Sequence, residues 1–388
     1  MEKNIYTNKN HNLCIKCILS DAIEGVRIES DGICNYCKLI EQLENEYKTG
    51  TPDGEKKLLE IIDKIKKEGK NKKYDCVIGV SGGTDSSFLL YKAIELGLRP
   101  LAVHYDNTWN SAIATENIRK ITTKLNIDLH THVVNNKEVD DIFKSFFKAS
   151  VIELDACTDI ALIETLYRAA SKYKVKYILE GHSFRAEGVA PPIGYIDGKY
   201  IKTIQKTFGT HKIDTFPNMS LIAFLKWMII KRIKRIRPYW YIDYSKEETR
   251  DFLEKEFDWK YYGGHHLENR MTAFQHSFYC PVKFGVDQTY NSLSALVRSG
   301  RMEREKALDL FLNNELYLEP ELVEYFKKRL GFSDEEFDSI LKKPVLTYKD
   351  FKTYKQSFEK LKPLFWLMYK LDLVPKSFYV KYTAKGDI

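Results

Sequence analysis

The segment VIGVSGGTDSS at residues 77–87 constrains the fold of this chain more than any other feature. Val77, Ile78 and Val80 are strong strand formers, and the Ser-Gly-Gly that follows permits a tight turn whose backbone N–H groups approach an anion. Residues 85–91 then indicate the opening of a helix, and a helix N-terminus attracts negative charge. We therefore predict a strand, a phosphate-binding turn and a helix.

Two other phosphate-binding loops are excluded by inspection. A Walker loop needs a Lys before its Ser or Thr, and a dinucleotide fingerprint needs glycines at G-x-G-x-x-G spacing. The sequence SGGTDS has neither feature. It resembles the SGGxDS loop of the PP-loop ATP pyrophosphatases, which split ATP into AMP and pyrophosphate.

The residues around this loop follow an α/β pattern. Apolar strands are predicted at residues 75–80, 100–105, 129–134 and 177–180, with helices between them at 111–125 and 160–172. This alternation predicts a doubly wound, Rossmann-like parallel sheet. Ligands of such sheets bind at the carboxyl ends of the strands. We therefore expect the polar residues that follow the strands to converge with the loop in one crevice, namely Asp106, Asn107, Glu180 and Gly181.

Charge and hydropathy narrow the class of protein. The 388 residues include 61 Lys and Arg against 54 Asp and Glu, and this net charge of +7 suits anionic small molecules as well as nucleic acid. The first residues are polar, and no uncharged apolar run approaches the ~20 residues of a membrane span. The sequence therefore predicts a cytoplasmic protein without a membrane span.

Four of the seven cysteines form two C-x-x-C pairs separated by sixteen residues, Cys14 with Cys17 and Cys34 with Cys37. This spacing predicts two knuckles that present four thiolates to one structural zinc ion. A redox pair or an iron–sulfur cluster uses the same ligands and stays open. The remaining cysteines, at positions 76, 157 and 280, have no catalytic setting.

Composition and periodicity suggest five segments. We expect a four-cysteine zinc knuckle at 1–45, a charged helical connector at 46–73, the PP-loop ATP-binding domain at 74–200, a mainly helical substrate or assembly domain at 201–345, and a tail at 346–388 that packs on the body or on a partner. The basic run KRIKRIR at 231–237 is interpreted as the solvated flank of a core helix, in preference to a helix that binds a membrane or RNA.

Several blocks along the chain are similar to the N-acetyl sugar amidotransferase family of pseudaminic acid, legionaminic acid and O-antigen biosynthesis. They are DGICNYCK, VSGGTDSS, HYDNTWNS, EGHSFRAEG, YIDYSKEE, YYGGHHLENRMTAFQHSFYCPVKFGVD and LSALVRSGRMEREKAL. The chain departs from the family pattern at His265, where the family has Lys, and near His182, where the family has Asn or Thr.

This resemblance implies an ATP-dependent enzyme that converts a sugar N-acetyl group to an acetamidino group. ATP adenylates the amide oxygen, and ammonia then displaces AMP. No cysteine lies in a G-x-C-x-G glutaminase elbow, and residue 2 is Glu, so no N-terminal cysteine nucleophile exists. The resemblance therefore implies a separate glutaminase, with a cyclase-like subunit, as the source of ammonia.

Roles for individual residues follow as hypotheses. Asp85 is expected to hold Mg²⁺, and Glu187 is a second metal carboxylate, a general base for ammonia or a solvated loop acid. Lys202 is expected to meet an anionic group of the substrate. Pyrophosphate is assigned to Ser81, Gly82, Gly83, Thr84 and Ser86, the nucleoside to Asp106, Asn107, Glu180 and Gly181, and substrate contact or acid–base chemistry to His265, His266 and Glu268.

Two alternatives remain. A tRNA-modifying PP-loop enzyme, of the thiolation or lysidine type, would also adenylate its substrate and would account for the basic charge. The tRNA thiolases use catalytic cysteines or a cluster placed after the loop, whereas Cys157 is single and has no C-x-x-C companion. The sequence therefore disfavours nucleic acid as a partner. The other alternative is a nucleotide-sensing or zinc-dependent scaffold without enzymatic activity.

Overall fold

A five-stranded parallel sheet in the order β3-β2-β1-β4-β5 forms the centre of the protein. The computed structural model describes residues 11–371 except 190, 192–193, 265–266 and 314–319, together with 373–374, 379 and 382–383. The strands are β1 (Cys76–Gly79), β2 (Pro100–Asp106), β3 (Leu129–Val133), β4 (Tyr177–Leu179) and β5 (Lys234–Ile236). The first four confirm the predicted strands.

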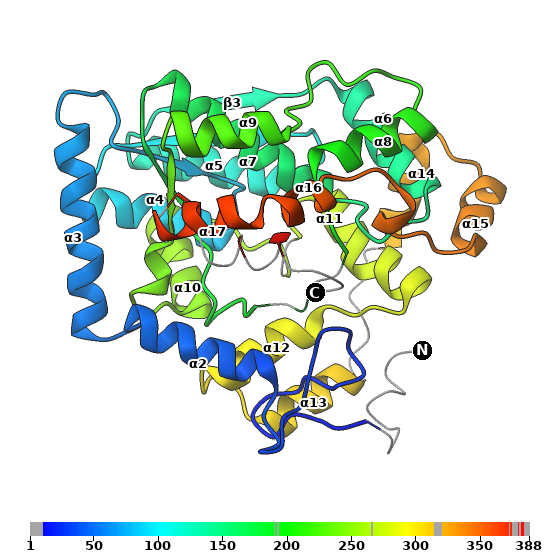
Figure 1. Ribbon diagram of the computed structural model, residues 1–388, viewed down its shortest axis with the longest axis horizontal. Coiled ribbons are helices and arrows are strands. Elements are labelled where there is room, and N and C mark those ends of the chain that lie inside the picture. The colour runs from blue at the N-terminus through cyan, green and yellow to red at the C-terminus, as the bar shows by residue number, and fades with distance from the viewer. Residues whose placement is uncertain are drawn as a thin grey trace.

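Helices surround the sheet and continue beyond it (Figure 1). The first half of the chain contains α2 (Asn35–Tyr47), α3 (Pro52–Gly69), α4 (Thr84–Glu95), α5 (Ala112–Lys124), α6 (Asn136–Lys148), α7 (Ala156–Lys172) and α8 (Gly198–Phe208). The second half contains α9 (Leu221–Leu225), η1 (Lys226–Ile230), η2 (Pro238–Trp240), α10 (Lys246–Phe257), α11 (Arg270–Phe274), η3 (Gln275–Phe284), α12 (Thr289–Arg298), α13 (Arg304–Asn313), α14 (Pro320–Leu330), α15 (Asp334–Lys342), η4 (Tyr348–Asp350), α16 (Lys355–Lys360) and α17 (Lys362–Lys370).

Strand β1 shows why the sheet is covered on both faces. Ile78 and Val80 pack into a core that α3, α4, α5 and α10 complete, whereas Val77 packs into a second core with α7, η1, α16 and α17. Successive side chains of a strand point to opposite faces, so an uninterrupted apolar strand belongs between two helical layers. The predicted doubly wound sheet is therefore confirmed.

A third core joins α6 and α8 to the C-terminal helices α11, α14 and α15. It is rich in aromatic rings, among which Phe274 of α11 and Phe326 of α14 stack with centroids 3.8 Å apart. The region beyond the sheet is mainly helical, as the sequence predicted. Through this core the C-terminal helices lie against α6, which follows β3 in the chain.

The fifth strand corrects one sequence interpretation. The basic run at 231–237 directly follows η1, but it is not a fully solvated flank, because residues Lys234–Ile236 form an edge strand parallel to β4. Arg235 and Arg237 both form ion pairs with Glu180, which follows β4. Pairing with this carboxylate draws the basic segment onto the sheet.

Glu153, between α6 and α7, is a carboxyl group with 4 % exposure that has no cationic partner in the described structure. The Tyr195 N–H donates to its Oε1 at 2.9 Å and the Tyr200 hydroxyl to its Oε2 at 3.3 Å. Burial nevertheless raises the pKa of Glu153 to about 7, because a low-dielectric site disfavours the charged form.

This shifted pKa predicts a pH-dependent stability. The folded pKa lies above the ordinary value of 4.5, so the folded state holds the proton more tightly than the unfolded chain, and stability falls as pH rises from about 4.5 through 7. Glu153→Gln removes this loss. In urea unfolding we expect it to raise the free energy of unfolding by about 3 kcal/mol at pH 8 and by less than about 1 kcal/mol at pH 5.

The control for this measurement is Glu60→Gln, which changes an exposed carboxylate on α3. It should leave the difference between the two pH values as in the wild type. An equal effect of Glu153→Gln at pH 5 and pH 8 would contradict the assignment.

Among the described residues, no helix combines the length and apolar character needed to cross a membrane.

Candidate active site

The loop after β1 has the geometry of an anion cradle. Gly82 has φ +82°, and a Cβ added to it would lie 2.2 Å from the carbonyl oxygen of Ala114, so only glycine fits. The Ser81 hydroxyl accepts the Gly83 N–H at 3.2 Å, and the Ser86 hydroxyl accepts the Ser81 N–H at 3.3 Å. Gly83, the N-cap residue of α4, has no side chain to cap the helix, so this end of α4 can bind an anion through its backbone N–H groups.

Asp85, in the first turn of α4, is the centre of a charged cluster. The ammonium of Lys246, at the start of α10, lies 2.9 Å from Asp85 Oδ2 and 3.5 Å from Glu187 Oε1. The Tyr244 hydroxyl donates to Asp85 Oδ1. Segments that are about 60 to 160 residues apart in the sequence thus meet at the phosphate loop. Both carboxylates predicted as metal ligands are in this cluster.

The charges of the cluster stabilise one another. Burial alone would raise the pKa of Asp85, but the Lys246 ammonium and the Tyr244 hydroxyl hold it below its usual value. Burial would lower the pKa of Lys246, but Asp85 and Glu187 raise it. Asp85 and Lys246 are therefore both charged at neutral pH.

Two tyrosines fix the position of Asp85. The rings of Tyr239 and Tyr244 stack with centroids 4.1 Å apart, and the Tyr239 hydroxyl donates to the Asp85 carbonyl oxygen at 2.9 Å. Gly181, after β4, lies on the same residue: a Cβ there would be 3.1 Å from the Asp85 backbone. The close approach at Gly181 in this structure is therefore to the loop itself.

A cavity of about 130 Å³ opens beside the loop. Thr84 and Lys246 line it on the side of the loop, and Arg250, Tyr261 and Arg301 line it elsewhere. The Arg250 guanidinium lies 4.5 Å from the centroid of the Tyr261 ring. Three cationic side chains and an aromatic face make this cavity suitable for an anionic ligand with a ring.

The carboxylate of Glu180, which the sequence assigned to the nucleoside, is held by two arginines. Its carboxylate binds Arg235 and Arg237, the latter at 3.0 Å. Burial opposes ionisation, but the two guanidinium groups hold the pKa of Glu180 below its usual value. One carboxylate between two arginines leaves an excess positive charge at the carboxyl ends of β4 and β5.

His182, two residues further on, is neutral. Burial and the nearby Arg237 lower its pKa to about 4. The Trp240 indole N–H lies 3.1 Å from His182 Nδ1, so Nδ1 accepts and the proton belongs on Nε2, which is 3.9 Å from Glu187.

The polar residues after β2 lie beside the segment that contains Glu268. Asp106 Oδ1 accepts the Thr108 N–H at 2.7 Å, and the Asn107 side-chain oxygen accepts the Trp109 N–H at 3.0 Å. Glu268 Oε1 lies 3.5 Å from the Ser81 hydroxyl, which brings this carboxylate to the phosphate loop.

The remaining predicted catalytic residues are elsewhere. Lys202 lies exposed on α8, and no contact in the described structure links it to the loop. His265 and His266 lie outside the described residues.

The four paired cysteines form one buried cluster whose sulfur atoms all lie within 4.8 Å of one another. The sulfur atoms of Cys14 and Cys37 are 3.8 Å apart, and those of Cys17 and Cys34 are 3.7 Å apart. A tetrahedral site with Zn–S bonds of about 2.3 Å separates its sulfurs by about 3.8 Å. The cluster therefore fits a tetrahedral metal ion.

Helix α12 connects this cluster to the active site. Its last residue, Arg298, donates to the sulfurs of Cys37 at 3.3 Å and Cys17 at 3.6 Å. Arg301 donates to the Tyr244 carbonyl oxygen at 2.9 Å, and Asn291 to the Glu187 carbonyl oxygen at 2.8 Å. The cysteine cluster thus anchors α12, which contacts Glu187, and the turn after this helix, which contacts Tyr244.

Comparison with protein families gives two matches. Residues 75–186 match the phosphoadenosine phosphosulfate reductase domain. Residues 268–364 match the C-terminal domain described as LPS biosynthesis protein WbpG-like. A search of curated proteins found no match.

The solved structures to which this chain is similar share little sequence with it. NMN synthetase from Francisella tularensis is 14% identical, with 75% of this chain and 95% of that chain covered and a TM-score of 0.33. The NH3-dependent NAD synthetase from Campylobacter jejuni is 13% identical, with coverage of 75% and 98% and a TM-score of 0.31. The U34-tRNA thiolase NcsA from Methanococcus maripaludis is 14% identical, with coverage of 83% and 99% and a TM-score of 0.33.

The two family matches agree with the loop geometry and with the blocks quoted from the sequence. They confirm the resemblance at the level of domains: the chain contains a PP-loop domain that matches the phosphoadenosine phosphosulfate reductase domain, and it carries a WbpG-like LPS-biosynthesis domain at its C-terminal side.

Proposed function

We propose that this enzyme is an ATP-dependent amidotransferase that converts the N-acetyl group of a sugar to an acetamidino group. The observation that supports this proposal most is the half-buried cluster of Asp85, Lys246 and Glu187 at the phosphate loop, beside a cationic cavity. Adenylation requires cationic groups at the phosphate loop, where Lys246 lies. The nitrogen nucleophile requires a base, for which Glu187 is the candidate. An anionic sugar requires a cationic binding surface, which the cavity provides. The WbpG-like domain supports a substrate from surface-glycan synthesis.

The reaction proceeds in two balanced steps. The amide oxygen attacks the α-phosphorus of ATP, pyrophosphate leaves, and the acetyl carbon becomes an electrophile with a good leaving group. Ammonia then adds to that carbon, loses a proton, and AMP departs with the former acetyl oxygen. The product is an amidine.

Residues of this chain would bind the reactants in these two steps and stabilise the charges that develop. The N–H groups at the start of α4 and the Lys246 ammonium neutralise the departing pyrophosphate. Glu187 is the candidate base for the proton of ammonia, since its carboxyl group lies at the phosphate loop, 3.5 Å from the Lys246 ammonium. Arg250 and Arg301 hold an anionic group of the sugar or of its nucleotide carrier.

Magnesium fits the same cluster. Asp85 and Glu187 supply the carboxylate oxygens that Mg²⁺ prefers, and each oxygen keeps a lone pair beyond its bond to Lys246 or Tyr244. When bound, the ion would neutralise the phosphates during attack on the α-phosphorus.

Ammonia comes from a separate glutaminase in this proposal. All seven cysteines are buried, and four of them form the metal-type cluster. Burial raises the pKa of Cys76 and Cys157, so both remain thiols at neutral pH and neither is suited to attack glutamine. We place the enzyme in the cytoplasm, where ATP is available.

The experiment is pyrophosphate release with ATP, Mg²⁺ and ammonium over a panel of N-acetylated nucleotide sugars and nonulosonic acids, followed by mass spectrometry of the sugar. We expect one substrate to stimulate release and to exchange O for NH. Release stimulated by tRNA instead of any sugar would contradict the proposal and favour the tRNA-modifying alternative. ATP binding without release, even with ammonium and a glutaminase present, would favour a nucleotide sensor.

A further inference from the structure

The turn after β2 is held in a conformation that its own sequence disfavours. Thr108 has φ +62°, in the left-handed region that a β-branched residue adopts only when neighbouring groups hold it there. The side chains of Asp106 and Asn107 accept the next backbone N–H groups of this turn. The orientation of both residues, which the sequence assigned to the nucleotide, therefore depends on Thr108.

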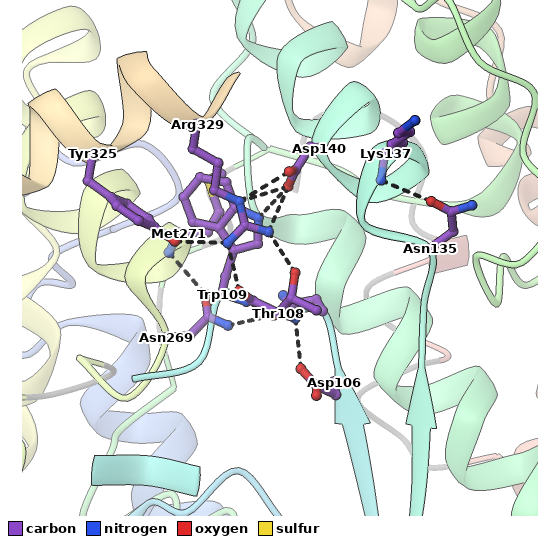
Figure 2. A network of polar contacts seen from close by, with 11 residues as sticks. Asp106, Thr108, Trp109, Asn135, Lys137, Asp140, Asn269, Met271, Tyr325 and Arg329 are labelled. Carbon is purple, nitrogen blue, oxygen red and sulfur yellow. Dashed lines mark hydrogen bonds and ion pairs between the residues drawn. The ribbon is translucent and has the colours of Figure 1, made fainter. Parts of the chain in front are cut away.

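Arg329 of α14 holds this turn from the C-terminal domain (Figure 2). Its guanidinium donates to the carbonyl oxygen and the hydroxyl of Thr108, both at 2.6 Å, and to the Asp140 carboxylate at 3.0–3.2 Å. It also lies 4.1 Å from the centroid of the Trp109 ring, whose indole N–H donates to Asp140 at 2.8 Å. With a further bond to the Tyr325 hydroxyl, every guanidinium N–H has an acceptor.

Asn269 adds a second contact from the same domain. Its side-chain amide donates to the side-chain oxygens of Asn107 at 3.0 Å and Asn110 at 3.2 Å. The bonds to Asn107 all use its oxygen. Its amide nitrogen is buried and has no partner among the described residues, and the residue is only 1 % exposed. A buried donor in this state is available to a ligand acceptor at the carboxyl end of β2.

We propose that Arg329 is a positioning residue for ATP: through Thr108 it fixes the turn that presents the Asn107 amide to the nucleotide. Both Arg329 and Asn269 lie within the WbpG-like match at 268–364, so this domain completes the nucleotide site of the domain before it. The inference rests on the proposed function, because it requires ATP in the crevice beside β2.

Calorimetric titration of ATP into the wild-type protein and five variants tests the inference. Arg329→Met should weaken ATP binding by about 10-fold or more. Arg329→Lys should weaken it nearly as much, because an ammonium cannot span Thr108 and Asp140 as the planar guanidinium does. Lys328→Met, which alters an exposed cation one position earlier on α14, should bind ATP like the wild type.

Asn107→Asp tests whether Arg329 affects ATP binding through the Asn107 amide or only through the stability of the fold. The aspartate keeps the oxygens that accept from Trp109 and Asn269 but loses the amide donors, so it should weaken ATP binding to a similar extent. Because Arg329 acts through Asn107, the double variant Arg329→Met/Asn107→Asp should bind ATP no more weakly than the weaker single variant.

Wild-type affinity in Arg329→Lys, or losses that multiply in the double variant, would overturn the inference and leave the proposed function intact. Failure of the wild-type protein to bind ATP at all would overturn both. Melting temperatures measured in parallel identify a variant whose loss of binding reflects unfolding, and Arg329→Lys then replaces Arg329→Met in the cycle.

Discussion

Asp85→Asn is expected to reduce pyrophosphate release by at least about 100-fold while the protein stays folded. Asparagine has the shape of aspartate and still accepts from the Tyr244 hydroxyl, so the tyrosine stack is preserved. It lacks the negative charge that pairs with Lys246 and that a magnesium ion requires. The assay is pyrophosphate release at saturating ATP, with the melting temperature measured alongside.

Asp63→Asn is the matched control, because it removes an exposed carboxylate on α3 that no contact in the described structure links to the loop. It should release pyrophosphate at the wild-type rate. Full activity of Asp85→Asn would contradict both roles assigned to Asp85, in magnesium binding and in the charge cluster with Lys246.

The second large effect is expected at the cysteine cluster. Cys34→Ser removes one of four thiolates, so we expect bound metal to fall by more than about half and the melting temperature to fall by about 10 °C. Because Arg298 and α12 connect the cluster to Arg301 and Glu187, the KM for the sugar should also rise. Metal content is measured by mass spectrometry, which also distinguishes zinc from iron in the wild type.

Cys157→Ala provides the comparison for a buried cysteine outside the cluster. It should keep its full metal content, even if the small cavity lowers its stability slightly. Wild-type metal content in Cys34→Ser would refute the metal site.

The parts of the fold that the sequence predicted are those that short-range chemistry determines. Strand β1, the turn at Gly82 and the start of α4 lie within one short segment, and their residue types permit little else. The cysteine cluster was predicted because the C-x-x-C spacing of each pair is visible in the sequence itself. Glu187 was predicted only as one of three alternatives, a second metal carboxylate, a general base or a solvated loop acid, and the structure places its carboxyl group beside the Lys246 ammonium.

The parts that were missed depend on contacts between distant segments. Lys246 follows the helix cap Ser245 and precedes two glutamates, a pattern that indicates an ordinary exposed helix start. Its partner Asp85 is 161 positions away, and Arg329 is 221 positions from Thr108. Strand β5 forms because Glu180 attracts its arginines, and no apolar alternation marks it. The blocks YIDYSKEE and LSALVRSGRMEREKAL contained Lys246 and Arg301, but only the fold shows that they meet at the loop.

The most direct test of the central claim follows the oxygen atom of the sugar's acetamido group. The substrate identified in the panel is labelled with oxygen-18 at that carbonyl and turned over with ATP, Mg²⁺ and ammonium, and the released AMP is analysed by mass spectrometry. Adenylation of the amide predicts that the label appears in the AMP phosphate and that the acetamidino product has lost it. Unlabelled AMP together with a sugar that retains the heavy oxygen would contradict the proposed reaction.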